Sequence, residues 1–182
     1  MNLLRRGIIQ SLGAKEDMNI IEFFDGSIDS GSTKDVALSQ VVDLDKSAII
    51  FFGSHSTGGA NISLARAEFL DDSTVRLTRG SSTATETFYQ FYVVDFPDSL
   101  SVNYYDADVS SLSQTQAITS VNSGGGRSFI LSSASNTDAL NTINDRVECF
   151  CEFASDTLVT VSRQGAFGVS TCGFFVIELP PL

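Results

Sequence analysis

The sequence has few of the residues on which metal binding, disulfide frameworks and histidine-based catalysis depend. Its 182 residues include one histidine, three cysteines, three prolines and no tryptophan. A single histidine does not make an ordinary zinc site, and three cysteines are too few for a disulfide scaffold and odd in number. The composition therefore disfavours a metalloprotein and a disulfide-rich secreted domain, and we expect no cofactor.

Basic residues are also scarce, because 11 Lys and Arg stand against 22 Asp and Glu, a net charge of −11. An acidic surface repels nucleic acid phosphates and anionic lipids, so we expect neither nucleic acid nor a membrane as a principal partner. No apolar run approaches the length of a transmembrane helix. The first residues carry Arg5 and Arg6 but no apolar stretch long enough for a signal peptide, which predicts a protein made in the cytoplasm and used without export.

What the sequence does contain favours a globular, β-rich chain. It is 42% hydrophobic and 18% charged, with 14 phenylalanines. Phenylalanine fills a core without needing a polar partner. A low charged fraction is typical of packed assemblies in which Ser, Thr, Asn and Gln supply the polar surface.

An internal repeat organises the chain. Six blocks of the first half recur in the same order in the second, and the small drift in their spacing is what loop insertions between strands produce. The paired blocks are residues 23–25 and 104–106, 37–41 and 117–121, 46–50 and 127–131, 66–68 and 146–148, 75–79 and 159–163, and 90–96 and 173–179. We infer an N-terminal arm over residues 1–15 and two tandem domains over 16–97 and 98–182, joined by a short linker at Pro97.

Each block is predicted to be a β-strand. Residues 75–79 and 158–163 alternate apolar and polar side chains, as a strand with one solvated face does. Residues 48–52 form a continuous apolar run, typical of a strand buried on both sides. Short strands separated by Gly-, Ser- and Asn-rich turns predict an all-β fold of two duplicated β-sandwich, jelly-roll-like domains. Residues 11–24 and 137–145 could each form a turn or two of helix.

Three local motifs suggest chemistry, and each departs from its pattern. His55 occupies the place of the nucleophilic serine in a G-x-S-x-G-like sequence, so we interpret it as an exposed loop histidine. Asp25-x-Ser27-x-Asp29 begins like a calcium loop but lacks the later glycine and glutamate. The glycines at 124–126 precede a strand rather than a helix and form no ordinary phosphate cradle. We expect no enzymatic activity.

The cysteines leave several possibilities open. Cys149 and Cys151 lie two apart in a predicted strand and so share a face. They could be small apolar core residues, one of them could form a disulfide with Cys172, or they could link subunits. If the strands form a simple meander, those of Cys149 and Cys172 are not neighbours, which disfavours a bridge within the domain.

Charged residues recur with the repeat and are predicted to form structural ion pairs or subunit contacts. A catalytic carboxylate pair is less favoured, because duplication would imply two active sites in one chain. The recurring residues are Arg66, Glu68, Arg79 and Asp95 in the first half, and Arg146, Glu148, Arg163 and Glu178 in the second.

The order of these motifs resembles a β-domain found, often in tandem, in structural proteins of tailed phages, namely decoration, collar and tail-fibre components. In the first half the resemblance rests on Val42-Asp43, Lys46-Ser47, Arg66, Arg79 and residues 93–96. In the second half it rests on Val121-Asn122, Arg127-Ser128, Arg146, Arg163 and residues 176–179. The second half departs from the pattern at the triple glycine and at Cys149 and Cys151. The resemblance implies a structural role in the virion, with no catalytic residues.

We therefore expect a homo-oligomeric virion protein that decorates or cements a capsid or forms part of a collar or tail. A trimer of two-domain chains would make a pseudo-sixfold ring. The N-terminal arm could dock on an acidic or apolar neighbouring virion protein, through Leu3, Leu4, Arg5, Arg6, Ile8 and Ile9.

The alternative is a receptor- or glycan-binding module of a tail fibre. Its candidate contact residues are Tyr89, Tyr92, Tyr104 and Tyr105. These tyrosines lie in or beside predicted strands, which favours a place in the core or an interface.

Overall fold

The computed structural model describes residues 18–29, 31–56, 65–79, 86–136, 149–163 and 169–179, and within these ranges the backbone forms twelve β-strands and no helix. The prediction of an all-β fold is confirmed. The strands of the first half are β1 (Asn19–Ile28), β2 (Thr33–Ala37), β3 (Ser47–Ser56), β4 (Ala65–Asp71), β5 (Thr74–Arg79) and β6 (Thr87–Asp95). Those of the second half are β7 (Ser101–Val109), β8 (Ser113–Ala117), β9 (Ser128–Asn136), β10 (Cys149–Ser155), β11 (Leu158–Arg163) and β12 (Ser170–Glu178).

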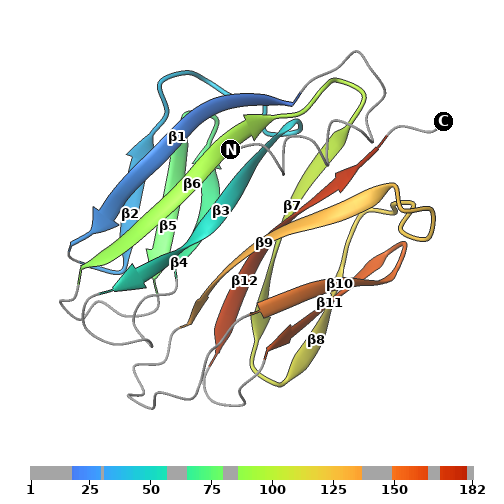
Figure 1. Ribbon diagram of the computed structural model, residues 1–182. Helices are drawn as coiled ribbons and strands as arrows, with labels where there is room; N and C mark the ends of the chain where they lie inside the picture. The colour runs from blue at the N-terminus through green and yellow to red at the C-terminus, as the bar shows by residue number, and fades with distance from the viewer. Residues whose placement is uncertain are drawn as a thin grey trace.

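The strands form four antiparallel three-stranded sheets. Sheet A has the order β1-β6-β3, sheet B β2-β5-β4, sheet C β7-β12-β9 and sheet D β8-β11-β10. The pairing order of β7 to β12 thus repeats that of β1 to β6. Figure 1 shows the two groups of six strands side by side, with β9 and β12 of the second group next to β3 and β4 of the first.

Main-chain hydrogen bonds outside the sheets recur as well. After β2, the amides of Leu38 and Val42 donate to the turn between β4 and β5, at Ser73 O and Asp72 O. After β8, the amides of Ile118 and Val121 donate to Thr157 O and Asp156 O in the turn between β10 and β11. The blocks 37–41 and 117–121 were predicted as strands, and this is wrong beyond Ala37 and Ala117, because the residues that follow form loops whose amides bond to turns instead of to a neighbouring strand.

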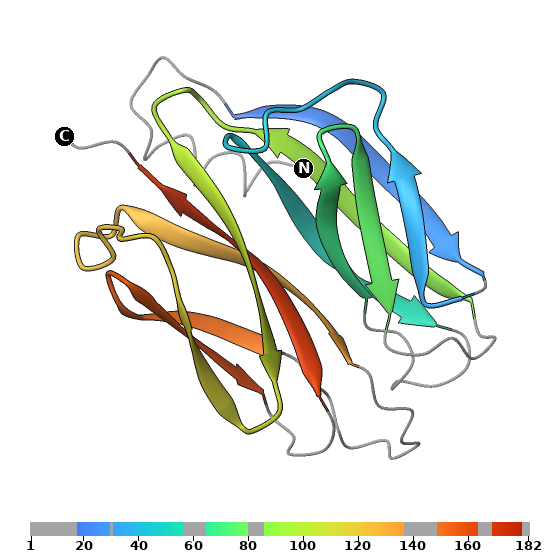
Figure 2. The same cartoon turned by 180° about the vertical axis from the view of Figure 1, so that it is seen from behind.

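The hydrophobic core continues from one half into the other. Sheets A and B enclose Val75, Leu77, Phe91 and Val93, and the same cluster includes residues of sheet C, among them Val102, Phe175 and Ile177. The rings of Phe69 and Phe175 meet edge to face with centroids 5.9 Å apart. Sheet C lies between the first half and sheet D, as the view from behind shows (Figure 2), and it contributes buried residues to both hydrophobic clusters. Phe96, beside the predicted linker, is itself buried.

Two further predictions need correction or qualification. A turn or two of helix was predicted within residues 11–24, but residues 19–24 belong to β1. Phe23 and Phe24 point to opposite faces of this strand, where the Phe23 ring packs at a tilt against Tyr92 and the Phe24 ring stacks on Phe91 of β6. The run at 48–52 is a strand, but a bulge after Phe51 leaves Phe52 exposed rather than buried. The arm over 1–15 and the residues 137–145 lie outside the described residues.

In the part of the chain that the structure describes, there is no helix long and apolar enough to span a membrane.

Candidate functional site

A polar cluster joins the two halves at the edge of sheet B. Arg66 and Glu68 of β4 lie on the outer face of that sheet and reach β7. Arg66 Nη2 lies 3.1 Å from Glu68 Oε1, and Arg66 Nη1 lies 3.6 Å from Asp106 Oδ2 and 3.4 Å from the Tyr104 hydroxyl. The Tyr104 hydroxyl donates to Glu68 Oε2 at 3.3 Å. The cluster thus ties β4 to β7 across the boundary between the halves.

The environment of this cluster keeps Tyr104 protonated. Burial raises the pKa of Tyr104 far above its ordinary value, and the neighbouring carboxylates of Glu68 and Asp106 add to the rise against the opposing Arg66 cation. A phenol with such a pKa acts as a hydrogen-bond donor rather than as a base.

The close packing of this cluster depends on Gly173, because a Cβ at this position would clash with the Tyr104 hydroxyl and lie 3.1 Å from Arg66 Cδ.

The edge of β4 is covered in the same region. The amide of Ala67 faces away from β5 and donates to Ser133 Oγ of β9 at 3.1 Å. An uncovered strand edge is a template for pairing with other chains, and β9 covers this one.

Arg79 and Arg163 are buried at equivalent places in the two halves. Arg79 Nε donates to Gly31 O at 2.8 Å, and its Nη1 donates to Thr87 Oγ1 at 3.0 Å. Arg163 Nε donates to Ser111 O at 2.8 Å, and its Nη2 donates to Ser110 O at 3.1 Å. Arg163 Nη1 also donates to Ser170 Oγ of β12 at 3.4 Å. Each arginine therefore fastens the turn between the first two strands of its half to the last strand, a structural role.

The remaining predicted charges are placed at the ends of strands. Asp95 accepts a hydrogen bond from the Ser47 hydroxyl on β3, and Glu178 Oε1 accepts one from the Asn122 amide at 3.0 Å. Arg146, Glu148 and the docking arm of Leu3, Leu4, Arg5, Arg6, Ile8 and Ile9 lie outside the described residues.

An ion pair that was not predicted from the sequence lies beside Pro97. Lys46 Nζ lies 2.7 Å from Asp98 Oδ1. Hydrogen bonding to Lys46 lowers the pKa of Asp98, and hydrogen bonding to Asp98 raises that of Lys46. Lys46 belongs to a block that recurs in the sequence, but its partner could not be inferred because Asp98 lies 52 residues away in the sequence.

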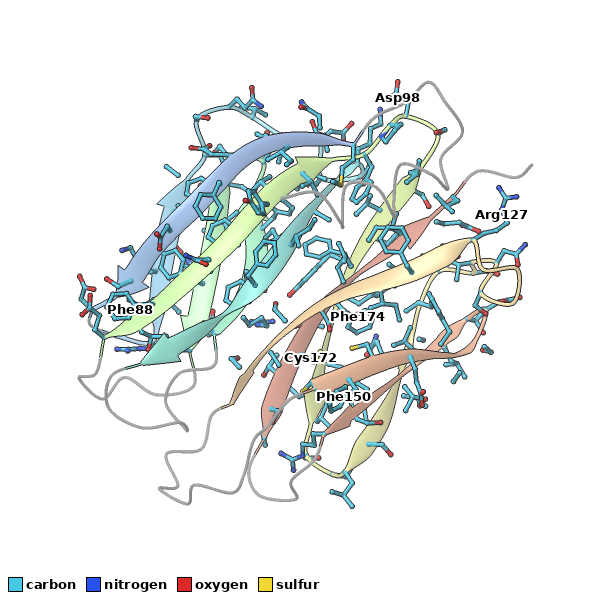
Figure 3. All side chains as sticks on the ribbon, in the orientation of Figure 1. Phe88, Asp98, Arg127, Phe150, Cys172 and Phe174 are labelled. Carbon is cyan, nitrogen blue, oxygen red and sulfur yellow. The ribbon has the colours of Figure 1, made fainter. Side chains whose placement is uncertain are left out.

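The register of β10 also changes how the repeats align. Cys149 lies opposite Arg163 as Ala65 lies opposite Arg79, so Phe150 and Glu152 occupy the places of Arg66 and Glu68. The sequence match of 66–68 with 146–148 is therefore displaced by four residues. Phe150 lies on β10 (Figure 3).

The three cysteines come together between sheets C and D. Cys151 Sγ lies 3.4 Å from Cys172 Sγ, and all three thiols are free. Hydrogen bonding to the Cys172 thiol lowers the pKa of Cys149 in spite of partial burial, and the Arg163 cation adds to the effect. Hydrogen bonding to the other two thiols and burial raise the pKa of Cys172. The strands β10 and β12 are not sheet neighbours, as predicted for a meander, but the thiols still meet because sheets C and D face each other.

The outer face of sheet A carries an exposed apolar surface, which we call the outer aromatic patch: Ile20, Phe23, Phe52 and Tyr92. The Phe23 and Tyr92 ring centroids are 4.8 Å apart, and those of Phe52 and Tyr92 are 5.3 Å apart. Phe23 is 47% exposed and Phe52 is 54% exposed. Among the candidate glycan-contact tyrosines only Tyr92 belongs to the patch. Tyr89 is buried, Tyr104 lies in the polar cluster with Arg66, and Tyr105 stacks on Phe174.

The other motifs give no ligand cage in the described ranges. His55 lies in β3 opposite Phe88, so the prediction of a loop position was wrong. Asp25 and Ser27 belong to β1, and the Ser27 hydroxyl donates to Asp29. No group of three or more His, Cys, Asp or Glu side chains in the described ranges could hold a metal ion.

Comparison of the chain with protein-family models, with curated proteins and with solved structures finds no match.

Proposed function

We propose that the protein is a bacteriophage virion structural protein, a capsid decoration or cement protein or a collar or tail component, that associates with copies of itself and binds the particle. The observation that carries the proposal is the outer aromatic patch on a strand-rich, acidic scaffold. Contiguous exposed aromatic side chains on a soluble protein mark a surface made for a protein partner. The resemblance of the repeated motifs to tailed-phage structural proteins gives the class of that partner.

We further propose that residues 16–97 and 98–182 are tandem copies of one jelly-roll-like domain. The recurrence of strand order, of loop hydrogen bonds and of the buried arginines supports this. A jelly roll packs two four-stranded sheets. The orders β1-β6-β3 and β2-β5-β4 are those that remain when one edge strand is removed from each of them.

A trimer of such chains would form a ring of six similar domains, which suits a site of sixfold or pseudo-sixfold symmetry. The proposal includes no catalytic role. The Arg66, Glu68 and Tyr104 cluster is engaged in joining the halves, and the net charge of −11 disfavours nucleic acid and anionic membranes as partners.

The test is whether the chain is part of the particle. Virions from a lysate of the host that carries this gene are banded by density, and an antibody against the purified chain is used to probe the band and the soluble fraction. A decoration, collar or tail component co-purifies with the band at a fixed number of copies per particle, measured by quantitative mass spectrometry. Abundance in the lysate with absence from the banded particles would contradict the proposal.

A second candidate function, glycan or receptor binding by a tail fibre, is favoured by one feature of the same surface. Asp25 and Gln90, a cross-strand pair on β1 and β6, lie exposed beside Phe23, so that polar groups border the outer aromatic patch. A glycan array that retains a ligand with the native chain and loses it with Phe52→Ala would support this function. The matched control is Leu112→Ala, at an exposed leucine between β7 and β8.

A further inference from the structure

The outer aromatic patch has a counterpart within the same chain. Phe23 lies opposite Tyr92 in sheet A as Tyr104 lies opposite Phe175 in sheet C. By the same registers, Ile20 corresponds to Val102 and Asp25 to Asp106. The patch on sheet A is therefore the equivalent of the surface of sheet C that faces the first half.

These two equivalent surfaces differ in how far they are covered. On sheet C, β4 and the residues around it lie against the surface, and Val102 is 3% exposed. On sheet A the corresponding Ile20 is 41% exposed. The fold thus uses this surface once, inside the chain, and presents it a second time to solvent.

The surface that does the covering is also present twice. In the first half it is the open side of the sandwich at β3 and β4, where Ala65 and Ala67 are buried and the two strands contact β9 of sheet C. In the second half the corresponding side at β9 and β10 carries Cys149 and Cys151, which are only half-buried, and Phe150, which is 51% exposed. The second half therefore has an uncovered version of the side that the first half buries.

We propose that the β9–β10 side of one copy docks on the outer aromatic patch of the next copy, in the manner in which the β3–β4 side docks on sheet C within each chain. The proposal deepens the proposed function, since it rests on the self-association included there and names its two surfaces. The contact is head-to-tail, so repetition gives a closed ring if the rotation closes and a filament if it does not. A ring of three chains is the closed form that matches a pseudo-sixfold site.

The chemistry of the two surfaces changes together. Within the chain, Arg66 meets Tyr104 and Asp106. Between copies, Phe150 takes the place of Arg66 and Phe23 that of Tyr104, so an aromatic contact replaces a polar one. Asp25 and Glu152 stand where Asp106 and Glu68 stand in the chain, so the site still has the acidic groups that surround Arg66.

This correspondence makes opposite predictions for two substitutions at one residue. Phe150→Glu places a carboxylate beside Asp25 and Glu152, and we expect the dissociation constant between copies to rise about 30-fold or more, as for loss of an interface hot spot. Phe150→Arg recreates the chemistry of the junction within the chain and is expected to keep association within a few-fold of the native level. Leu70→Glu, at an exposed leucine of β4 in sheet B that belongs to neither surface, is the matched control and is expected to change nothing.

The full-length chain and its variants are compared by sedimentation velocity over a range of concentrations, with circular dichroism to verify the fold. A charge swap tests whether residues 25 and 150 meet across the contact. If they do, adding Asp25→Arg to Phe150→Glu is expected to restore association. Association of Phe150→Glu equal to that of the native chain would overturn the proposal, as would a native chain that stays monomeric at high concentration.

Two further outcomes separate this contact from others. If deletion of residues 1–15 abolishes association while Phe150→Glu does not, the N-terminal segment is the contact and the proposal is wrong. If Phe150→Glu abolishes association but the chain is absent from banded virions, the copy contact stands and the virion role fails.

Discussion

At the scale of single residues, Arg79 and Arg163 are buried at equivalent places in the two halves. Arg79 is 1% exposed, and its guanidinium holds a turn carbonyl and the Thr87 hydroxyl. Replacement by methionine keeps the apolar stem but leaves those acceptors without their charged donor inside the core. We expect Arg79→Met to lower the free energy of unfolding by about 2–4 kcal/mol, measured by urea denaturation.

The control for this prediction is Arg76→Met on the neighbouring solvated face. Arg76 pairs with Asp35 at 2.8 Å on the surface, and an exposed pair of this kind contributes little to stability. Equal losses for Arg76→Met and Arg79→Met would show that burial of the arginine does not matter.

The cysteine cluster predicts an order of reactivity. The pKa of Cys149 is lowered and that of Cys172 is raised, so the Cys149 thiolate forms at lower pH. Near neutral pH we expect iodoacetamide to alkylate Cys149 first and the fully buried Cys172 last. The order is measured by mass spectrometry of the alkylated peptides. Arg163→Met removes the nearby cation and should shift the alkylation profile of Cys149 to higher pH. A profile that does not move would exclude that electrostatic cause.

The same cluster predicts which disulfide forms. Oxidised glutathione takes two electrons from two thiols, and the 3.4 Å separation of Cys151 Sγ from Cys172 Sγ favours their pairing. We expect a mapped Cys151–Cys172 bond and one remaining free thiol at Cys149. The variant Cys151→Ser should instead give either a Cys149–Cys172 bond or none, and dimers linked through Cys172 would contradict its buried place.

At the scale of elements, period-two alternation predicted β5 and β11 because half of each strand faces solvent. The strands β2 and β8 were missed, since TKDVA and SQTQA are short, polar edge strands with no apolar face to reveal them. The equivalence of Phe150 with Arg66 could not be predicted, because the two residues share no chemistry and only ladder register relates them. The patch was hidden for a related reason, since burial of Tyr104 and exposure of Phe23 depend on packing between the halves.

The tight junction of β12, β7 and β4 gives a prediction at this scale. An added Cβ at Gly173 would meet the Tyr104 hydroxyl and Arg66 Cδ, so Gly173→Ala must displace one of them. We expect a loss of about 1–3 kcal/mol in the free energy of unfolding, measured by denaturant titration. Tyr104→Phe removes the closest atom and should recover part of that loss.

Gly124→Ala is the matched control, because a Cβ there meets nothing within 4 Å. If Gly173→Ala lowers the free energy of unfolding equally in the native chain and in Tyr104→Phe, the added Cβ and the Tyr104 hydroxyl are not in steric conflict.

At the scale of the whole molecule, sheet C contributes to the hydrophobic cores of both halves. Its outer face belongs to the core of the first half, and its inner face packs on sheet D through Phe174 and Val176. Two halves that share so much buried surface should not unfold separately, although each has its own pair of three-stranded sheets.

We therefore expect the chain to unfold in one cooperative transition, because exposing either half would also expose sheet C. Arg79→Met in the first half and Arg163→Met in the second should each lower the same midpoint, seen both by far-ultraviolet circular dichroism and by tyrosine fluorescence. A variant that splits the curve into two steps would instead show that the repeats retain independent stability. In that case the contact of Phe69 with Phe175 would resemble a docking interface more than a shared core. The same measurement also tests the proposed contact between copies. A ring or filament of copies stabilises the folded state, so the denaturation midpoint would rise as protein concentration increases.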